Sequence, residues 1–292
     1  MQRRVRSLLF TATGLLWGCH VLAGLDDFAV EPNGRGGAGG QGGASRTSTG
    51  GGGDVAPALE DEGLVARYFL DDDRASPRVA DAAPTPVDLS IVLDDMQEPA
   101  LVGMEGRRAL QWSTETSWGR PWIPSVGGTK LYARLHDSEL ATLEIVVRLQ
   151  SVNELGSRLL HFGSNTEPGR LSLRMGMPGE LRYYVNDVPI ATGKVPMGQR
   201  VVIHGVLDAR MQVSPAALYL NGEPVSLTQT GFEGPIDLDD CHFAIGNRRS
   251  DASDGRSFRG RIYYAAVYDV AFTPTRVKAH AGHLLESDDT PD

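Results

Sequence analysis

Closely spaced turn signals between short apolar runs constrain this chain most strongly, because they leave room for strands and for very little helix. The pair Asn221-Gly222 separates residues 217–220 from residues 223–227, and Asn-Gly is the strongest short-range signal for a two-residue hairpin loop. Met177-Pro178-Gly179 divides a second pair of runs, since proline fixes φ and glycine accepts a positive φ. We therefore predict two antiparallel hairpins in the second half of the chain.

Further strands and two helices complete the predicted architecture. Strand-like runs lie at residues 63–70, 88–93, 107–112, 143–149, 170–176, 180–185, 200–207 and 258–268. Residues 129–139 have helical spacing, and Thr273-Pro274 opens a second helix, to about residue 285, with a hydroxyl cap and a proline in the first turn. Many strands, frequent turns and little helix predict an all-β fold, an antiparallel β-sandwich with a short internal helix and a short C-terminal helix.

The N-terminus has a pattern typical of export. Three arginines lie among the first six residues, and the apolar stretch at residues 8–17 has the length of a signal peptide core. The following Leu16-Trp17-Gly18-Cys19 resembles the lipobox of bacterial lipoproteins, although Trp17 stands where a small residue is usual. The resemblance implies that residues 1–18 are removed and that Cys19 carries the lipid.

An uncleaved membrane anchor is the alternative for this segment. Residues 7–25 carry no formal charge, and their number is roughly enough to cross a bilayer. Both interpretations place the folded part outside the cytoplasm, because positive charge stays on the inner side. His20 stands where lipobox proteins retained at the inner membrane often have aspartate, which favours the outer membrane or the cell surface.

Composition divides the chain into four predicted parts. Glycine dominates residues 33–53, and such a segment cannot offset its ordering entropy by forming a core. We therefore expect a signal peptide at 1–18, a flexible linker at 19–56, a β-sandwich domain at 57–285 and an acidic tail at 286–292.

The net charge is −9, and removing residues 1–18 takes away three arginines and no acid, which gives −12. This balance argues against a nucleic-acid partner.

Four stretches of the predicted domain are similar to the laminin-G-like, concanavalin A-like jelly-roll domains of bacterial surface proteins. They lie at residues 63–69, 131–147, 218–225 and 258–273, and include the Tyr-x-Asn-Gly hairpin and the closing strand and helix. The resemblance implies a jelly roll over about residues 60–284. It leaves the function open, because lectins, glucanases, pentraxin-like binders and passive spacers share this fold. Where the family has a Trp-His pair, this chain has Val202-Ile203-His204, and we expect His204 to pack or hydrogen-bond within the sheet.

The sequence offers little for catalysis. Glucanases of this fold carry closely spaced acids on one strand, whereas Glu144 stands alone among apolar neighbours. His280 and His283 lie three apart on the predicted helix without a third metal ligand, so we expect both to be exposed to solvent.

We predict a non-catalytic surface lipoprotein that binds a carbohydrate or protein ligand. The alternatives are a glycan hydrolase and a purely structural or adhesion domain without a small ligand.

Candidate ligand contacts lie in two segments predicted as loops. Trp118, Arg120 and Trp122 combine flat aromatic rings with a cation, and such side chains on a rigid sandwich are suited to contact a sugar. Asn247 and Arg248 belong to a second polar, exposed loop that either lines a ligand rim or merely connects two strands. The alternative is that the tryptophans seal the edge of the core.

Acidic residues near the first and last predicted strands suggest a structural calcium ion. Asp71, Asp72 and Asp81 follow the first strand, and Asp269 ends the last one. Because the first and last strands of a jelly roll often lie side by side, these hard oxygen ligands are predicted to bind one Ca²⁺. The alternative is a solvated acidic loop, which also describes residues 237–240.

Overall fold

A computed structural model describes residues 59–71, 78–92, 100–104, 107–112, 119–151, 156–166, 168–176, 179–211, 213–225, 228–229, 232, 234–247 and 258–288. The predicted leader and linker lie outside the described residues, and so do four of the predicted site residues, Cys19, Asp72, Trp118 and Arg248. No helix within the described ranges is long and apolar enough to cross a membrane.

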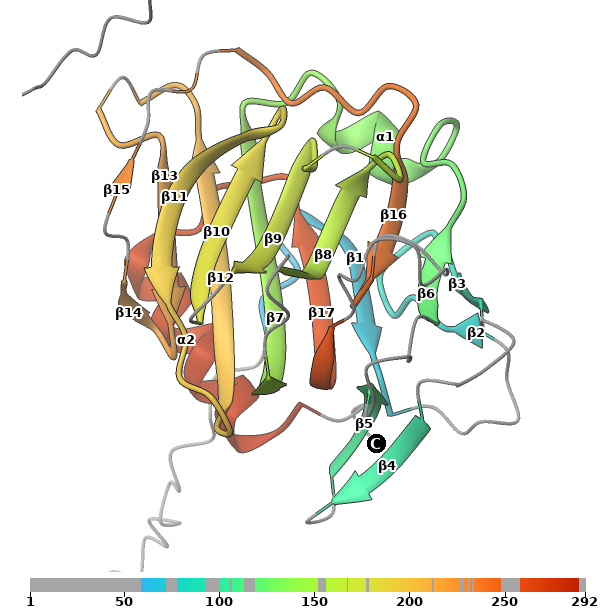
Figure 1. Cartoon of the computed structure of the whole chain (residues 1–292). Helices are drawn as coiled ribbons and strands as arrows, with labels where there is room; N and C mark the ends of the chain where they lie inside the picture. The colour runs from blue at the N-terminus through green and yellow to red at the C-terminus, as the bar shows by residue number, and fades with distance from the viewer. Residues whose placement is uncertain are drawn as a thin grey trace, which may run out of the picture. The chain divides into compact units, whose positions relative to one another are not determined.

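Two sheets of antiparallel strands form the fold, as predicted (Figure 1). Sheet A contains β1 (Leu64–Phe69), β4 (Ala100–Met104), β5 (Arg107–Trp112), β7 (Leu140–Ser151), β12 (Arg200–Asp208), β13 (Ala216–Leu220), β14 (Glu223–Pro224) and β17 (Arg259–Tyr268). Sheet B contains β2 (Arg78–Val79), β3 (Leu89–Val92), β6 (Arg120–Ile123), β8 (Ser157–Gly163), β9 (Leu171–Gly176), β10 (Glu180–Val185), β11 (Val188–Lys194), β15 (Thr228–Gln229) and β16 (His242–Ile245). The helices are α1 (Lys130–Leu135) and α2 (Pro274–Glu286).

Strand order follows from the hairpins and from a few long-range pairings. Sheet A runs β14-β13-β12-β7-β17-β5-β4, with β1 also paired to β17, and sheet B runs β15-β11-β10-β9-β8-β16-β6-β3-β2. The first and last strands therefore lie side by side, as expected for a jelly roll. Their pairing is antiparallel, with Leu64 opposite Tyr268 and Phe69 opposite Tyr264.

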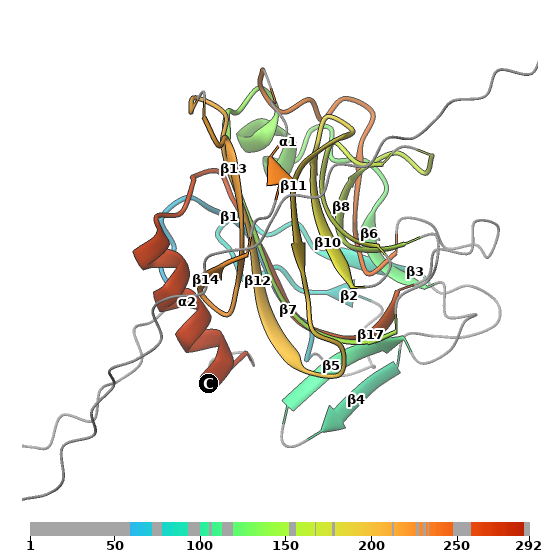
Figure 2. The same ribbon diagram turned by 60° about the vertical axis from the view of Figure 1, so that its left-hand side comes forward.

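The sandwich has a main core and a second, smaller apolar cluster. The main core contains inward side chains of both sheets, among them Ile145 of β7 and Leu173 of β9. The second cluster joins outward side chains of sheet A to α2, including Tyr268, Phe272 and Leu284. Figure 2 shows α2 along one side of sheet A, with sheet B on the other side. One face of sheet A thus packs on sheet B, and the opposite face packs on α2.

Local signals account for both helices. Thr129 precedes α1, and Leu131 and Leu135 bury one side of it. Thr273 caps α2, because its hydroxyl accepts a hydrogen bond from the backbone N–H of Arg276 at 3.3 Å, and Pro274 occupies the first turn. The Thr273 cap and Pro274 stand where the sequence predicts them.

Two sequence-based boundaries are wrong. The predicted loop around Trp122 contains the strand β6, which pairs with β16 on one side and β3 on the other, even though Pro121 cannot donate a ladder hydrogen bond. The expected tail at 286–292 begins inside α2, and the buried Asp288 forms an ion pair with Arg200, so the fold extends at least to residue 288.

Candidate ligand-binding face

Sheet B turns one set of side chains towards the core and the alternate set away from it. On β9, Leu171, Leu173 and Met175 belong to the core, so Ser172 and Arg174 point outward. We call the outward set the outer face of sheet B. The register places these strand residues on it: Arg78, Ser90, Arg120, Trp122, Arg158, His161, Ser172, Arg174, Glu180, Arg182, Tyr184, Thr192, Lys194, His242 and Ala244.

Trp122 is a partly exposed aromatic residue on this face. It belongs to β6, and only β3 and β2 lie between it and one edge of the sheet. The guanidinium carbon of the buried Arg120 lies 4.1 Å from the centroid of the Trp122 ring, in a cation–π contact. The ring of His242 meets Trp122 edge-on, with centroids 5.8 Å apart. Arg120 Nη1 also lies 3.4 Å from His242 Nε2, which must accept because a guanidinium only donates. The indole is therefore held by its neighbours rather than free on a loop.

The middle of the outer face is polar and buried. His161 Nδ1 lies 3.2 Å from the hydroxyl oxygen of Ser172, which donates its own proton to the carbonyl of Leu160 at 2.9 Å. The ring of His161 lies 5.3 Å from that of His242. This contact links the centre of the face to the group around Trp122.

The predicted rim residues separate into two sets. Arg120 and Trp122 lie two apart on β6 and share the outer face, where Trp122 is partly exposed and Arg120 is buried, and Asn247 is buried as well. Asn247 donates from Nδ2 to the carbonyl of Gly119 at 3.3 Å, and its Oδ1 accepts from the backbone N–H of Phe258 at 2.7 Å. The expectation that Asn247 lines an exposed rim is therefore wrong, because its amide fastens segments of the fold to each other.

Trp112 has the alternative role that the sequence suggested for the tryptophans. Its side chain is fully buried in the main core. Its indole N–H donates to the carbonyl of Gly119 at 2.7 Å. Trp112 therefore seals the core, and Trp122 is the described tryptophan that reaches a surface.

The three described members of the predicted calcium site, Asp71, Asp81 and Asp269, do not come together. In the antiparallel pair, Asp269 lies beside the start of β1, whereas Asp71 follows its end, on the order of 20 Å away. The Asp81 carboxylate accepts backbone N–H groups of Arg67 and Val87 and forms an ion pair with Lys130 at 2.6 Å. The grouping assumed that the two strands end at the same edge, which holds only for parallel pairing. Calcium binding by this chain stays a prediction.

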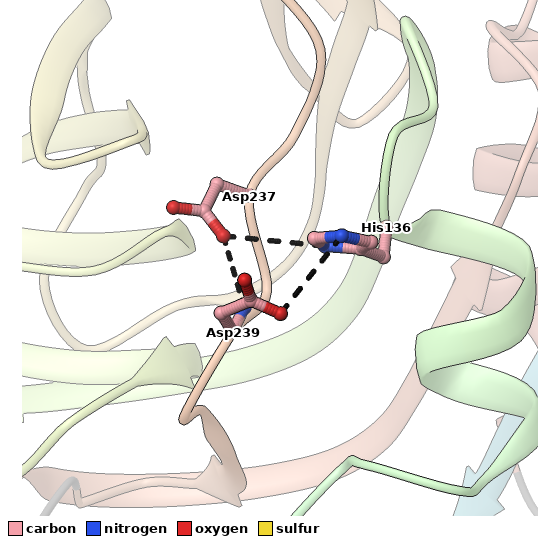
Figure 3. Close-up of side chains that lie close together, drawn as sticks. All are labelled: His136, Asp237 and Asp239. Carbon is pink, nitrogen blue, oxygen red and sulfur yellow. Dashed lines mark hydrogen bonds and ion pairs between the residues drawn. The ribbon is translucent and has the colours of Figure 1, made fainter.

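A cluster at one end of the sandwich was missed in the sequence. His136, directly after α1, faces Asp237 and Asp239 of the acidic loop, and one ligand atom from each lies within 4.8 Å of the others (Figure 3). His136 Nδ1 already accepts the backbone N–H of Leu238 at 3.1 Å, and the Asp239 carboxylate accepts the hydroxyl of Tyr132 at 2.8 Å. These bonds tie α1 to the loop before β16.

The densest cluster of titratable groups surrounds Glu144, which is 0% exposed. Its Oε1 accepts from His204 Nε2 at 2.8 Å and from His280 Nδ1 at 3.0 Å. Its Oε2 accepts from the hydroxyls of Tyr264 at 3.0 Å and Tyr268 at 3.2 Å. The prediction for His204 is confirmed. The prediction that His280 is exposed to solvent is wrong, because β7, β12, β17 and α2 converge here.

Burial and hydrogen bonding act on Glu144 in opposite directions. Burial by itself raises the pKa of the carboxyl group, but the hydrogen bonds from His204 and His280 outweigh it and hold the pKa of Glu144 well below its ordinary value. The carboxylate is therefore charged, fully paired and sealed from water. The sequence does contain a signal, because Glu144 and His204 each interrupt an apolar run. The structure shows that the two residues are direct cross-strand partners on β7 and β12.

Comparison with solved structures gives the fold a wider context. The chain is similar to Trypanosoma rangeli sialidase in complex with 2,3-difluorosialic acid, with a TM-score of 0.56 and 14% identity over 81% of this chain and 35% of that one. It is also similar to domain 4 of AbnA, a GH43 extracellular arabinanase from Geobacillus stearothermophilus in complex with arabinotriose, with a TM-score of 0.51 and 19% identity over 75% of this chain and 98% of that one.

A third similar structure is botulinum neurotoxin type C, whose cell entry is described as dependent on two ganglioside molecules. Here the TM-score is 0.54 and the identity 12%, over 75% of this chain and 51% of that one. The chain spans about a third of the sialidase and half of the neurotoxin structure. At these identities the likeness establishes the fold. No protein-family model matches the chain, and no curated protein matches its sequence.

Proposed function

We propose that this chain is a non-catalytic surface lipoprotein whose β-sandwich binds a carbohydrate through the outer face of sheet B. The position of Trp122 carries the proposal. Its ring is partly exposed, belongs to a strand paired on both sides, and is backed by the guanidinium of Arg120 at 4.1 Å. A fixed aromatic surface beside a few polar groups is the usual composition of a small-ligand site.

The similar structures support a sugar as the ligand class. Their descriptions name 2,3-difluorosialic acid for the sialidase, arabinotriose for the arabinanase domain and gangliosides for the neurotoxin. These compounds share hydroxyl-rich rings and little else. A sugar-binding role for this chain rests on that shared chemistry together with Trp122.

The surroundings of Glu144 support the absence of catalysis. A glycosidase that uses the common two-carboxylate mechanism needs both acids to reach the substrate. Glu144 is sealed and bonded to four side chains, and the side chains of Asp237 and Asp239 contact His136 and Tyr132. Glu144, Asp237 and Asp239 are thus occupied in holding the fold.

A glycan array with the full chain, purified in detergent, tests the sugar-binding proposal. We expect binding to at least one glycan class, and Trp122→Ala is expected to weaken it by at least about tenfold, or 1.4 kcal/mol. Trp122→Phe keeps an aromatic surface and is the matched control, with an intermediate effect. An array without any bound glycan, as expected of a structural or adhesion domain or of a protein-binding module, overturns the proposal. So does unchanged binding by a folded Trp122→Ala variant.

Lipid labelling and fractionation of the producing cells test the proposed location. Incorporation of a clickable fatty acid is expected in the wild type and is lost in Cys19→Ser, because the thiol is the acylation site. The variant is also expected to leave the membrane fraction. An unlabelled wild-type chain that stays in the membrane fraction identifies the uncleaved anchor instead, and recovery from the cytosol overturns both interpretations.

A further inference from the structure

The outer face of sheet B is positively charged in a protein that is negatively charged overall. The strand residues on this face include six cations, Arg78, Arg120, Arg158, Arg174, Arg182 and Lys194, and one acid, Glu180. The whole chain has a net charge of −9. Charge is therefore distributed unevenly, with cations gathered on the same face as Trp122.

Three of the arginines form a row across neighbouring strands. Arg158 of β8 pairs with Arg174 of β9, and Arg174 pairs with Arg182 of β10. Adjacent strands lie about 4.8 Å apart, and like charges directly opposite each other destabilise a sheet. Arg158 and Arg174 make other contacts within the protein, and the register places three guanidinium side chains next to one another on the outer face. A bound anion would offset the repulsion between these neighbouring guanidinium groups, so the row is suited to bind one.

The row is open to a ligand at one end. Arg158 is buried, Arg174 is partly exposed, and the side chain of Arg182 is 38% exposed. Glu180 forms an ion pair with Arg182 at 2.5 Å, which offsets part of its charge, and Lys194, opposite Glu180 on β11, is exposed. The accessible cations at this end of the row are thus Arg174, Arg182 and Lys194, and Arg78 is exposed near the other edge of the sheet. The guanidinium carbon of Arg174 lies 5.8 Å from the ring centroid of Tyr184.

We propose that the outer face of sheet B binds an anionic glycan, with Arg174 and Arg182 contacting its carboxylate or sulfate groups. This inference rests on the proposed sugar-binding function and names the class of sugar. A guanidinium offers a planar fork of N–H donors that matches these anions in a bidentate contact. A neutral sugar accepts hydrogen bonds from these groups but gains no attraction between opposite charges. A nucleic acid is disfavoured because the rest of the chain is acidic.

Binding of the full chain to four immobilised polymers tests the inference: polygalacturonate, dextran sulfate, neutral dextran and single-stranded poly(dT). We expect binding to polygalacturonate, to dextran sulfate or to both, with weaker binding at 300 mM than at 50 mM NaCl because salt screens the charges. The first two polymers distinguish carboxylate from sulfate recognition. Stronger binding to poly(dT) than to either acidic glycan overturns the inference.

Matched variants identify the residues. Arg174→Gln with Arg182→Gln is expected to lose at least about tenfold in affinity for the acidic polymer, whereas Arg174→Lys with Arg182→Lys keeps the charge and loses less. Arg210→Ala, an exposed arginine that pairs with Asp208 outside this face, is the control and leaves binding unchanged. Lys194→Glu reverses an exposed charge on the face, so it weakens binding even if the glutamine variant does not fold.

Failure of this inference is separable from failure of the proposed function. Equal binding of neutral glycans by the wild type and the folded double glutamine variant refutes the anionic class and leaves sugar binding intact. Absence of binding to any glycan refutes both. Unchanged binding of an acidic polymer by the folded double variant and by Lys194→Glu assigns the anion to another surface and also overturns the inference.

Discussion

His280 of α2 donates a hydrogen bond from Nδ1 to Oε1 of Glu144 on β7 at 3.0 Å. The other ring nitrogen, Nε2, accepts the backbone N–H of Glu60 at 3.2 Å, which fixes the proton on Nδ1 in the neutral imidazole. One side chain thus connects the centre of sheet A, the C-terminal helix and the first described residues of the chain. We expect this connection to govern the stability of the α2 side of the fold.

Removing the carboxylate of Glu144 is expected to destabilise the protein strongly. Glu144→Leu leaves two histidines and two tyrosines without their shared acceptor, and each buried donor left without a partner costs about 1–3 kcal/mol. Urea unfolding measures the loss. Glu223→Leu removes a glutamate that pairs with Lys278 on the surface and is expected to change the free energy of unfolding by less than about 1 kcal/mol. Similar values for both variants contradict the prediction.

Acid is expected to weaken the fold through the same carboxylate. Because the pKa of Glu144 is lower in the folded state than in the unfolded chain, its contribution is fully present above the unfolded value of about 4.3 and is lost as the pH falls further. The free energy of unfolding of the wild type should therefore decline below about pH 5. Glu144→Gln cannot titrate, so its decline over the same range is expected to be smaller. Parallel curves for the two proteins would rule out Glu144 as a source.

Gly246 is expected to tolerate no side chain. Its φ is +82°, and a Cβ at this position lies 2.5 Å from the buried ring of Trp112. Gly198 has a similar φ of +74° with open space around it, so Gly198→Ala carries the backbone strain without the collision. Urea unfolding is expected to show a loss for Gly246→Ala that exceeds the loss for Gly198→Ala by about 1–3 kcal/mol. Equal losses would mean that Trp112 can shift to make room.

Local chemistry accounts for what the sequence predicted correctly. Asn221-Gly222 closes the β13–β14 hairpin because residue 221 has φ +51° and residue 222 has φ +88°, a turn that these residue types favour. Thr273 caps α2 for an equally local reason, since its acceptor and the Arg276 N–H are three residues apart. Such features need no knowledge of the rest of the fold.

The errors arose where distant segments meet. Pro121 and the nearby glycine predicted a loop, and pairing with β3 and β16 overrode that preference. The cluster around Glu144 draws residues from four elements, with 136 residues between Glu144 and His280. Trp122 was identified from residue type, but the row that includes Arg174 depends on strand order and register. No periodicity within one segment reveals either.

Asp288, just after α2, gives a further prediction. A buried and paired aspartate contributes to the free energy of unfolding, whereas an aspartate in a solvated tail does not. The Asp288 carboxylate is fully buried and pairs with Arg200, whose guanidinium also bonds the carbonyl of Leu285 at the end of α2. Asp288→Ala is expected to cost about 3 kcal/mol in urea unfolding, since it leaves a largely buried cation without its anion. Asp208→Ala breaks the more exposed pair with Arg210 and should cost less than about 1 kcal/mol. If Asp288→Ala were as mild as Asp208→Ala, residues after α2 would be a solvated tail.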